Sequence, residues 1–170
     1  MQQPKVSVNL TYSGEIADNA KNRVMLDLLK RALDSRYMIS IREEKGGTYG
    51  VRVNGGTNKY PVEQYVITIK FDTNEQLADE LVEICDKEIK RIAEEGPLVE
   101  DIAKSKEFLQ KNYNNILESN SGWLSTIYNW YEEGYNYKDE YLDILASITE
   151  DDIKALAQRI LADGNRTLVV

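Results

Sequence analysis

The chain has 170 residues, a length that fits one domain with its own hydrophobic core. Its 29 acidic and 21 basic side chains give a net charge of −8, which argues against a nucleic-acid partner. It contains no histidine, which excludes a Ser-His-Asp triad, a Cys-His pair and a histidine-ligated zinc site made from its own residues. The charge is uneven, because residues 1–60 carry 10 basic and 6 acidic groups whereas residues 94–152 carry 4 basic and 14 acidic groups, and solvated helix faces account for most of this.

The first predicted elements are a strand and a long helix. Lys5–Tyr12 alternates between polar and apolar residues, which is typical of a half-buried strand, and Ser13-Gly14 is expected to end it. Apolar residues then recur at helical spacing over Glu15–Asp34. Residues 37–41 fit either a strand or further helical turns, and we assign them to a helix that ends at Gly46.

A β-hairpin is expected next. Tyr49–Asn54 and Val62–Phe71 predict its two strands, and Gly55–Asn58 predicts the turn between them. After the second strand, Thr73 and Gln76 have the spacing of a capping box, which predicts a helix start.

Two helices follow the hairpin in the prediction. The first runs from Leu77 to the Gly96-Pro97 pair, and Cys85 lies in its apolar stripe, so we expect a buried thiol and no nucleophile. The second covers Leu98–Glu118 with a narrower apolar stripe, which indicates an outer helix.

Aromatic residues are concentrated near the C-terminal end. Seven of the fifteen aromatic residues fall between Trp123 and Tyr141, where Asn120 and Ser121 are expected to cap a short helix followed by a loop. We expect Trp123 and Ile127 to pack in the core. An interface role is expected for some of Tyr131, Tyr135 and Tyr137, because exposed aromatic side chains anchor partners.

A capped helix and a strand complete the chain. Thr149 and Asp152 predict a capping box at the start of the helix Ile153–Leu161, Gly164 predicts its C-cap, and Thr167–Val170 predicts a strand. We therefore expect residues 1–170 to form a single α+β domain, a mainly antiparallel β-sheet with helices packed on one face. The last strand is expected to pair centrally in the sheet, beside the first.

The segment REEKGGTYGV holds the candidate site residues. Gly46 and Gly47 allow a sharp turn and close approach of another backbone. Arg42 offers a planar set of donors, and Tyr49, seven residues later, offers a neutral hydroxyl donor. The residues alone leave two interpretations open. One is a helix end with Arg42 in a surface ion pair and Tyr49 packed on the sheet. The other is a binding site for an extended peptide.

Four segments stand in a recognisable order: IREEKGGTYGV, GPLVEDIAKSK, NSGWLSTI and SITEDDIKALAQRI. With them the chain resembles the C-terminal, non-catalytic, metallohydrolase-like domain of the pitrilysin and insulin-degrading-enzyme family of zinc peptidases. The family's inverted zinc motif H-x-x-E-H lies on an N-terminal domain, and this chain lacks it. The resemblance therefore implies no cofactor in this chain, which is not catalytic by itself, and zinc on the catalytic domain of the complete enzyme. It implies two partners, the catalytic half of the peptidase and extended peptide substrates.

The resemblance also implies roles for the candidate residues. Zinc and a glutamate on another domain activate water for attack on the peptide carbonyl. Tyr49 then donates a hydrogen bond in the transition state, Arg42 binds the substrate backbone, and Gly46 and Gly47 let the loop approach the substrate. The alternative is a structural or regulatory subunit of the same fold, as in processing peptidases or respiratory complexes. A nucleotide-binding glycine loop is disfavoured because GGTYG precedes a strand.

The sequence leaves the cellular compartment of the protein open. No apolar run approaches the roughly 20 residues that span a membrane, and residues 1–4 lack the features of a signal peptide. We expect a soluble chain that is a fragment of a longer multi-domain zinc peptidase. A periplasmic or cell-envelope location fits if a bacterial full-length enzyme carries a signal peptide.

Overall fold

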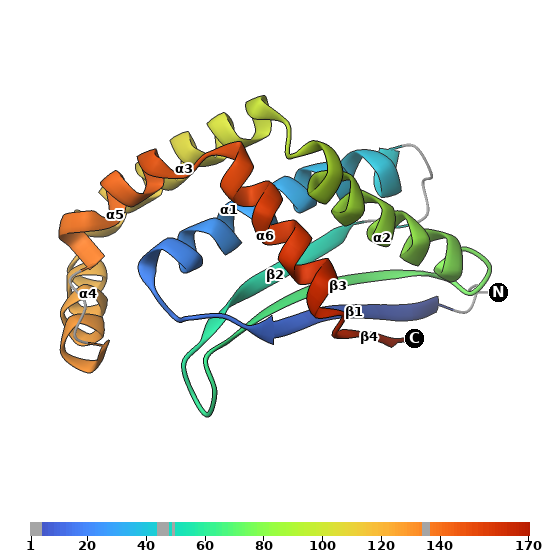
Figure 1. Cartoon of the computed structure of the whole chain (residues 1–170), viewed down its shortest axis with the longest axis horizontal. Coiled ribbons are helices and arrows are strands. Elements are labelled where there is room, and N and C mark those ends of the chain that lie inside the picture. Colours follow the sequence, from blue (N-terminus) through green and yellow to red (C-terminus); the bar gives the residue numbers. More distant parts are fainter. Residues whose placement is uncertain (1–4, 44–47, 49, 134–136) are drawn as a thin grey trace.

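The computed structural model describes residues 5–43, 48, 50–133 and 137–170. These residues form four strands, six α-helices and one short π-helical segment, η1, which continues the first helix. In chain order (Figure 1) they are β1 (Lys5–Glu15), α1 (Ala20–Tyr37), η1 (Met38–Glu43), β2 (Val51–Asn58), β3 (Gln64–Asn74), α2 (Ala78–Glu95), α3 (Val99–Leu117), α4 (Asn120–Glu133), α5 (Tyr137–Ser147), α6 (Glu150–Asp163) and β4 (Arg166–Val169).

The four strands form one antiparallel sheet in the order β2-β3-β1-β4. Alternate residues of β1, namely Val8, Leu10 and Tyr12, are buried, and β3 repeats this alternation with Ile67 and Ile69. Period-two burial gives the sheet one apolar face. Figure 1 shows α1, α2 and α6 on one side of the sheet. This arrangement confirms the predicted α+β class.

The core lies between the apolar face of the sheet and these helices. Burial of the apolar stripes of α1 and α2 against the sheet removes them from water, which is the main favourable contribution to folding. Cys85 of α2 is fully buried in this layer, as its place in the sequence predicts. The largest fully buried side chains are Tyr37, Tyr65, Leu10, Leu26, Leu28, Leu29, Leu33, Ile41, Ile67, Ile69, Leu81 and Ile89.

The first strand is longer, and the first helix begins later, than the sequence pattern suggested. β1 continues through Ser13-Gly14 to Glu15, because these residues still pair with β3. The helix begins at Ala20, after the side chain of Asn19 accepts a hydrogen bond from the backbone N–H of Asn22 at 2.9 Å. The helical assignment of residues 37–41 is confirmed, and the predicted end at Gly46 lies outside the described residues.

The predicted hairpin is present, but its turn is displaced. Gly55 and Gly56 lie inside β2 and pair with Ile67 and Val66 of β3, so the predicted turn over Gly55–Asn58 is wrong. Glycine lacks a side chain but keeps both backbone hydrogen-bonding groups, so the ladder continues through it. The connection between the strands comprises residues 59–63 instead.

The predicted capping box after the hairpin is also wrong. Thr73 is still part of β3, where it pairs with Val6. The side chain of Asn74 accepts a hydrogen bond from the backbone N–H of Leu77 at 2.9 Å, and α2 begins at Ala78 without a side-chain cap of its own. Asn74 therefore provides the side-chain hydrogen bond before α2 that the sequence pattern had assigned to Thr73.

The aromatic region differs most from its prediction. Residues expected to form a loop contain a further helix, α5, and Asn120 begins α4, whose first turn is capped by the hydroxyl of Ser119, which accepts from Gly122 N–H at 3.0 Å. Trp123 and Ile127 are 38% and 45% exposed, so the prediction that they pack in the core is wrong.

The end of the chain follows its prediction closely. Thr149 and Asp152 form the predicted capping box of α6, and Gly164 is the left-handed C-cap with φ of 67°. β4 pairs with β1, as Leu10 opposite Leu168 shows, but it forms an edge of the sheet and not its centre. Among the described residues, no helix combines the length and the apolar character needed to cross a membrane.

Candidate functional site

The structure describes the two ends of the predicted site segment. Arg42 lies in η1, one residue before the end of that helical segment, and its side chain is not among those described. Gly46, Gly47 and Tyr49 lie outside the described residues. The roles of Arg42, Gly46, Gly47 and Tyr49 therefore stay predictions.

The end of α1 that leads into η1 is held firmly against α2. Arg36 Nε donates to Glu88 Oε2 at 3.0 Å and Arg36 Nη2 donates to Glu88 Oε1 at 3.5 Å, with side chains only 16% and 11% exposed. The buried hydroxyl of Tyr37 donates to the backbone carbonyl of Cys85 at 3.1 Å. Ile41, the residue before Arg42, is fully buried. These contacts give the backbone at Arg42 a defined position.

The π-helical geometry of η1 is itself unusual. A π-turn inserts an extra residue into the helical repeat, and such turns occur frequently at functional sites. The hydroxyl of Ser40 donates to the backbone carbonyl of Arg36 at 2.9 Å, which supplies a partner for one carbonyl of this irregular stretch. The segment thus changes the direction in which residues after Ser40 project relative to a continuous α-helix.

The other end of the segment enters the edge strand β2. The Thr48 hydroxyl donates to Gly50 O at 3.2 Å and accepts from Gly50 N–H at 3.3 Å, and Val51 then pairs with Phe71 of β3. A groove of about 280 Å³ runs between α1 and this strand. It is lined by Lys30, Arg31, Asp34, Val51, Arg52, Val53 and Asn54.

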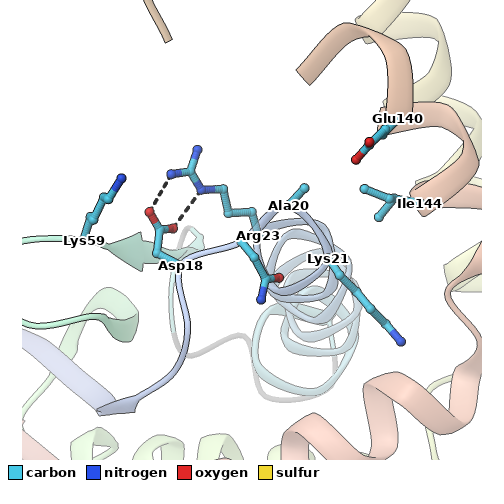
Figure 2. A pocket seen from close by; sticks show the side chains of 8 residues that line it. Asp18, Ala20, Lys21, Arg23, Lys59, Glu140 and Ile144 are labelled. Carbon is cyan, nitrogen blue, oxygen red and sulfur yellow. Dashed lines mark hydrogen bonds and ion pairs between the residues drawn. The ribbon is translucent and has the colours of Figure 1, made fainter. Parts of the chain in front are cut away.

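A second hollow, of about 380 Å³, lies at the start of α1 (Figure 2). Arg23 donates to both carboxylate oxygens of Asp18, at 2.8 Å from Nε and 2.6 Å from Nη2, and the Thr57 hydroxyl also donates to Asp18. The Arg23 hydrogen bonds lower the pKa of Asp18 despite the opposing effect of burial. Figure 2 shows Lys59 beside this pair, and Glu140 of α5 across the hollow.

The polar residues of this second hollow have a structural role. The Asp18 side chain is 2% exposed and its charge is balanced by Arg23, so the network fastens the β1–α1 connection to the end of β2. No sequence motif predicted this network. Asp18 beside the helix cap Asn19 was the only local signal, because Thr57 lies 39 positions away in the chain.

A third polar cluster fastens the last strand. Arg166 of β4 donates to both carboxylate oxygens of Asp86 at 2.9 and 2.8 Å, and the Tyr12 hydroxyl donates to the same carboxylate. Burial and the Asp86 carboxylate raise the pKa of Tyr12 well above its ordinary value. Burial likewise raises the pKa of the neighbouring Cys85 thiol to about 12, which keeps it protonated and unreactive at neutral pH.

The described residues contain no group of three or more His, Cys, Asp or Glu side chains arranged to hold a metal ion. The donor set that catalytic zinc sites use, three protein ligands commonly including histidine, is not available here because the chain has no histidine. The residues that the structure describes therefore do not fit a zinc site.

Among the described residues, helix α4 presents most of the exposed aromatic side chains. Figure 1 shows α4 at one end of the molecule, away from the sheet. Tyr131, expected at an interface, is 86% exposed, whereas Tyr135 and the side chain of Tyr137 lie outside what is described. The other exposed large apolar or aromatic side chains of α4 are Trp123, Leu124, Ile127, Tyr128 and Trp130.

Comparison with known proteins gives a consistent family assignment. Residues 1–109 match the family model described as the peptidase M16 inactive domain. A zinc protease PQQL-like protein of Arabidopsis thaliana is 24% identical in an alignment of 139 positions, which covers 78% of this chain and 14% of that protein.

Solved structures show the same fold. The periplasmic protease PqqL from Escherichia coli matches with a TM-score of 0.84 at 16% identity, over 99% of this chain and 19% of that one. An inactive peptidase domain from Bordetella parapertussis matches with a TM-score of 0.79 at 14% identity, over 99% of this chain and 93% of that one. The chain thus spans less than a fifth of the length of the Arabidopsis and Escherichia coli proteins.

Proposed function

Because the chain belongs to the family of peptidase M16 inactive domains, we propose that it is the non-catalytic, substrate-binding domain of a zinc-dependent endopeptidase. In this proposal Arg42 and Tyr49 face a peptide cleft, opposite a zinc site on another domain. The single observation that carries it is the family match over residues 1–109, which includes the whole segment from Arg42 to Val51.

The geometry at both ends of the segment supports this role. The Arg36–Glu88 pair and the buried Ile41 hold the backbone before Arg42, and the pairing of β2 with β3 holds the backbone after Tyr49. A binding group held on rigid elements loses little conformational entropy when the substrate arrives. The firm hold on both flanks of the segment supports the proposal that its side chains meet a peptide.

Each proposed residue has a definite task. Arg42 uses its planar guanidinium to donate to backbone carbonyls of the peptide and so holds it in register. Tyr49 donates its O–H to the carbonyl oxygen of the bond being cleaved, where negative charge grows in the transition state. Gly46 and Gly47 have no side chains to obstruct the peptide backbone.

The partner in this proposal is the catalytic part of the peptidase, on the same polypeptide or on another subunit. Zinc belongs to that part in the proposal, because this chain has no histidine to bind it. The match to an inactive domain of similar length supports residues 1–170 as one such domain. The name of the Escherichia coli relative supports a periplasmic location as part of the proposal.

The proposal is tested by Tyr49→Phe in the complete enzyme, assayed on a quenched peptide. The change keeps the ring and removes only the hydroxyl, so we expect kcat to fall roughly 10²- to 10³-fold with little change in KM. Tyr60→Phe is the matched control, since Tyr60 is 77% exposed in the β2–β3 connection. Turnover of Tyr49→Phe within about twofold of the parent would remove Tyr49 from the mechanism and favour a structural or regulatory role.

A further inference from the structure

The face of the sheet opposite α1, α2 and α6 carries a polar surface that the proposed function does not yet use. Successive side chains of a strand point to opposite faces, so the buried residues of β1, β2 and β3 place their neighbours on this open face. The strand register arranges those neighbours in rows across the sheet. Two of these rows are Arg52–Lys70–Asn9–Val169 and Asn54–Thr68–Thr11–Thr167.

The first row brings two cations together. Arg52 of β2 is directly opposite Lys70 of β3, and both side chains are exposed. Like charges at opposed positions, with Cβ atoms about 5 Å apart, repel each other. Among the described residues, no ion pair or hydrogen bond involves either side chain. By contrast, Lys30 and Arg31 beside the edge of β2 both pair with Asp27.

The carboxylate of Asp72 shares the open face with this pair but forms no ion pair with either cation among the described residues. Asp72, two positions from Lys70 on the same face of β3, accepts a hydrogen bond from the Ser7 hydroxyl of β1 at 2.6 Å. The remaining positions of the Arg52–Lys70 row, Asn9 and Val169, are uncharged. A carboxylate placed between Arg52 and Lys70 therefore meets two cations, which is strong electrostatic complementarity.

The pair is also close in sequence to the proposed site. Arg52 is the second residue of β2 and follows Tyr49 by three positions. The adjacent row adds hydroxyl groups, among them Thr11 and Thr68, whose oxygens are 3.4 Å apart. These groups offer hydrogen bonds to the backbone of a peptide without adding charge.

We propose that the Arg52–Lys70 pair binds an aspartate or glutamate side chain of the peptide substrate, so that the domain selects acidic peptides. This inference rests on the proposed function, because the occupant is the same peptide that Arg42 and Tyr49 hold. The net charge of −8 repels an acidic peptide from the chain as a whole. Selection of such a peptide therefore depends on this local pair.

The first test measures binding to this chain by fluorescence anisotropy. Three labelled peptides of equal length are compared: one rich in glutamate with an amidated C-terminus, its glutamine counterpart with the same amide, and the glutamine counterpart with a free C-terminus. We expect the glutamate peptide to bind most tightly, with an affinity that falls as salt is raised. Equal affinity of the three, no binding of the glutamate peptide, or a preference for the free C-terminus overturns the proposal.

Variants then locate the binding site. Arg52→Gln combined with Lys70→Gln is expected to weaken binding of the glutamate peptide roughly three- to tenfold, the scale of two exposed charge contacts. Lys87→Gln is the control, because Lys87 is an exposed cation on α2 and lies outside the open face. An equal loss in the control would show that overall charge, not the pair, attracts the peptide.

Kinetic assays of variants in the complete enzyme distinguish a failure of this inference from a failure of the proposed function. The double variant is expected to raise KM for the glutamate peptide selectively, relative to the glutamine peptide, whereas Tyr49→Phe is expected to lower kcat on both. If Tyr49→Phe leaves kcat unchanged but the double variant still shifts the KM ratio, the proposed role of Tyr49 fails and the acidic subsite stands. An unchanged KM ratio in the double variant overturns the acidic subsite alone.

Discussion

The ion pair between Arg36 and Glu88 gives a sharp prediction for stability. Glu88→Gln keeps the side-chain volume but removes the negative charge that balances the Arg36 guanidinium. Removing one partner of a fully buried pair costs about 3 to 5 kcal/mol. Here the two side chains keep 16% and 11% exposure, so some water reaches the cation and we expect a loss of about 2 to 3 kcal/mol in the free energy of unfolding.

The same helix provides the control for this measurement. Glu83 of α2 pairs with Lys87 at 3.8 Å, but both side chains are more than 70% exposed, at 72% and 71%. Glu83→Gln is therefore expected to cost less than about 0.5 kcal/mol. Urea unfolding of both variants is the assay, and a midpoint lowered by about 4 to 12 °C in thermal unfolding should accompany Glu88→Gln. Equal stability of the two variants would refute the argument that this pair anchors the end of α1.

Three further predictions concern single residues. Because burial raises the pKa of Cys85 to about 12, alkylation at pH 8 should be far slower in the folded chain than in urea, and equal rates would contradict its burial. The Thr149 backbone N–H lowers the pKa of Asp152, so Asp152→Asn should cost about 0.5 kcal/mol at neutral pH. That cost should shrink as pH falls below about 4, where the unfolded carboxylate takes up a proton, and should be lost below the lowered pKa of the folded carboxylate; a pH-independent difference in urea stability would contradict this. Gly14→Ala places a Cβ against the Asp163 carboxylate and 2.7 Å from the Tyr65 ring, whereas Gly56→Ala meets nothing within 4 Å. Only Gly14→Ala should therefore lower the free energy of unfolding in urea strongly, by about 1 to 3 kcal/mol.

Local signals predicted those parts of the fold in which neighbouring residues decide the structure. The capping box of α6 depends on Thr149 and Asp152, three positions apart, and both hydrogen bonds are present. The buried position of Cys85 follows from the helical period of its own segment. Such features need no knowledge of the rest of the chain.

Features set by distant pairing could not be predicted in this way. Gly55 and Gly56 have the local character of a turn, but their structure is decided by pairing with Ile67 and Val66 across the hairpin. Trp123 was assigned to the core from its type and spacing, yet the position of α4 at one end of the molecule leaves it 38% exposed. Helical periodicity shows which face is apolar and not what covers it.

The sequence identified the residues of the candidate site but not the contacts that support the segment. The spacing of Arg42 and Tyr49 and their resemblance to a peptidase family suggested a function for a short glycine-rich segment. The supports of that segment, Arg36 with Glu88 and Tyr37 with the carbonyl of Cys85, join residues 52 and 48 positions apart. No local pattern contains such contacts, so they became visible only in the folded chain.

Reconstitution from two polypeptides is the strongest test of a substrate-binding role for this domain. The zinc-bearing part of the peptidase and this chain are produced separately and mixed, and cleavage of a quenched peptide is followed. We predict that neither part cleaves efficiently alone and that the mixture does. We also predict that Arg42→Ala combined with Tyr49→Phe, in a chain that melts at the parent temperature, lowers turnover of the mixture at least about 100-fold. Cleavage by the zinc-bearing part at the same rate without this chain, or full activity with the double variant, would contradict a substrate-binding role for this domain.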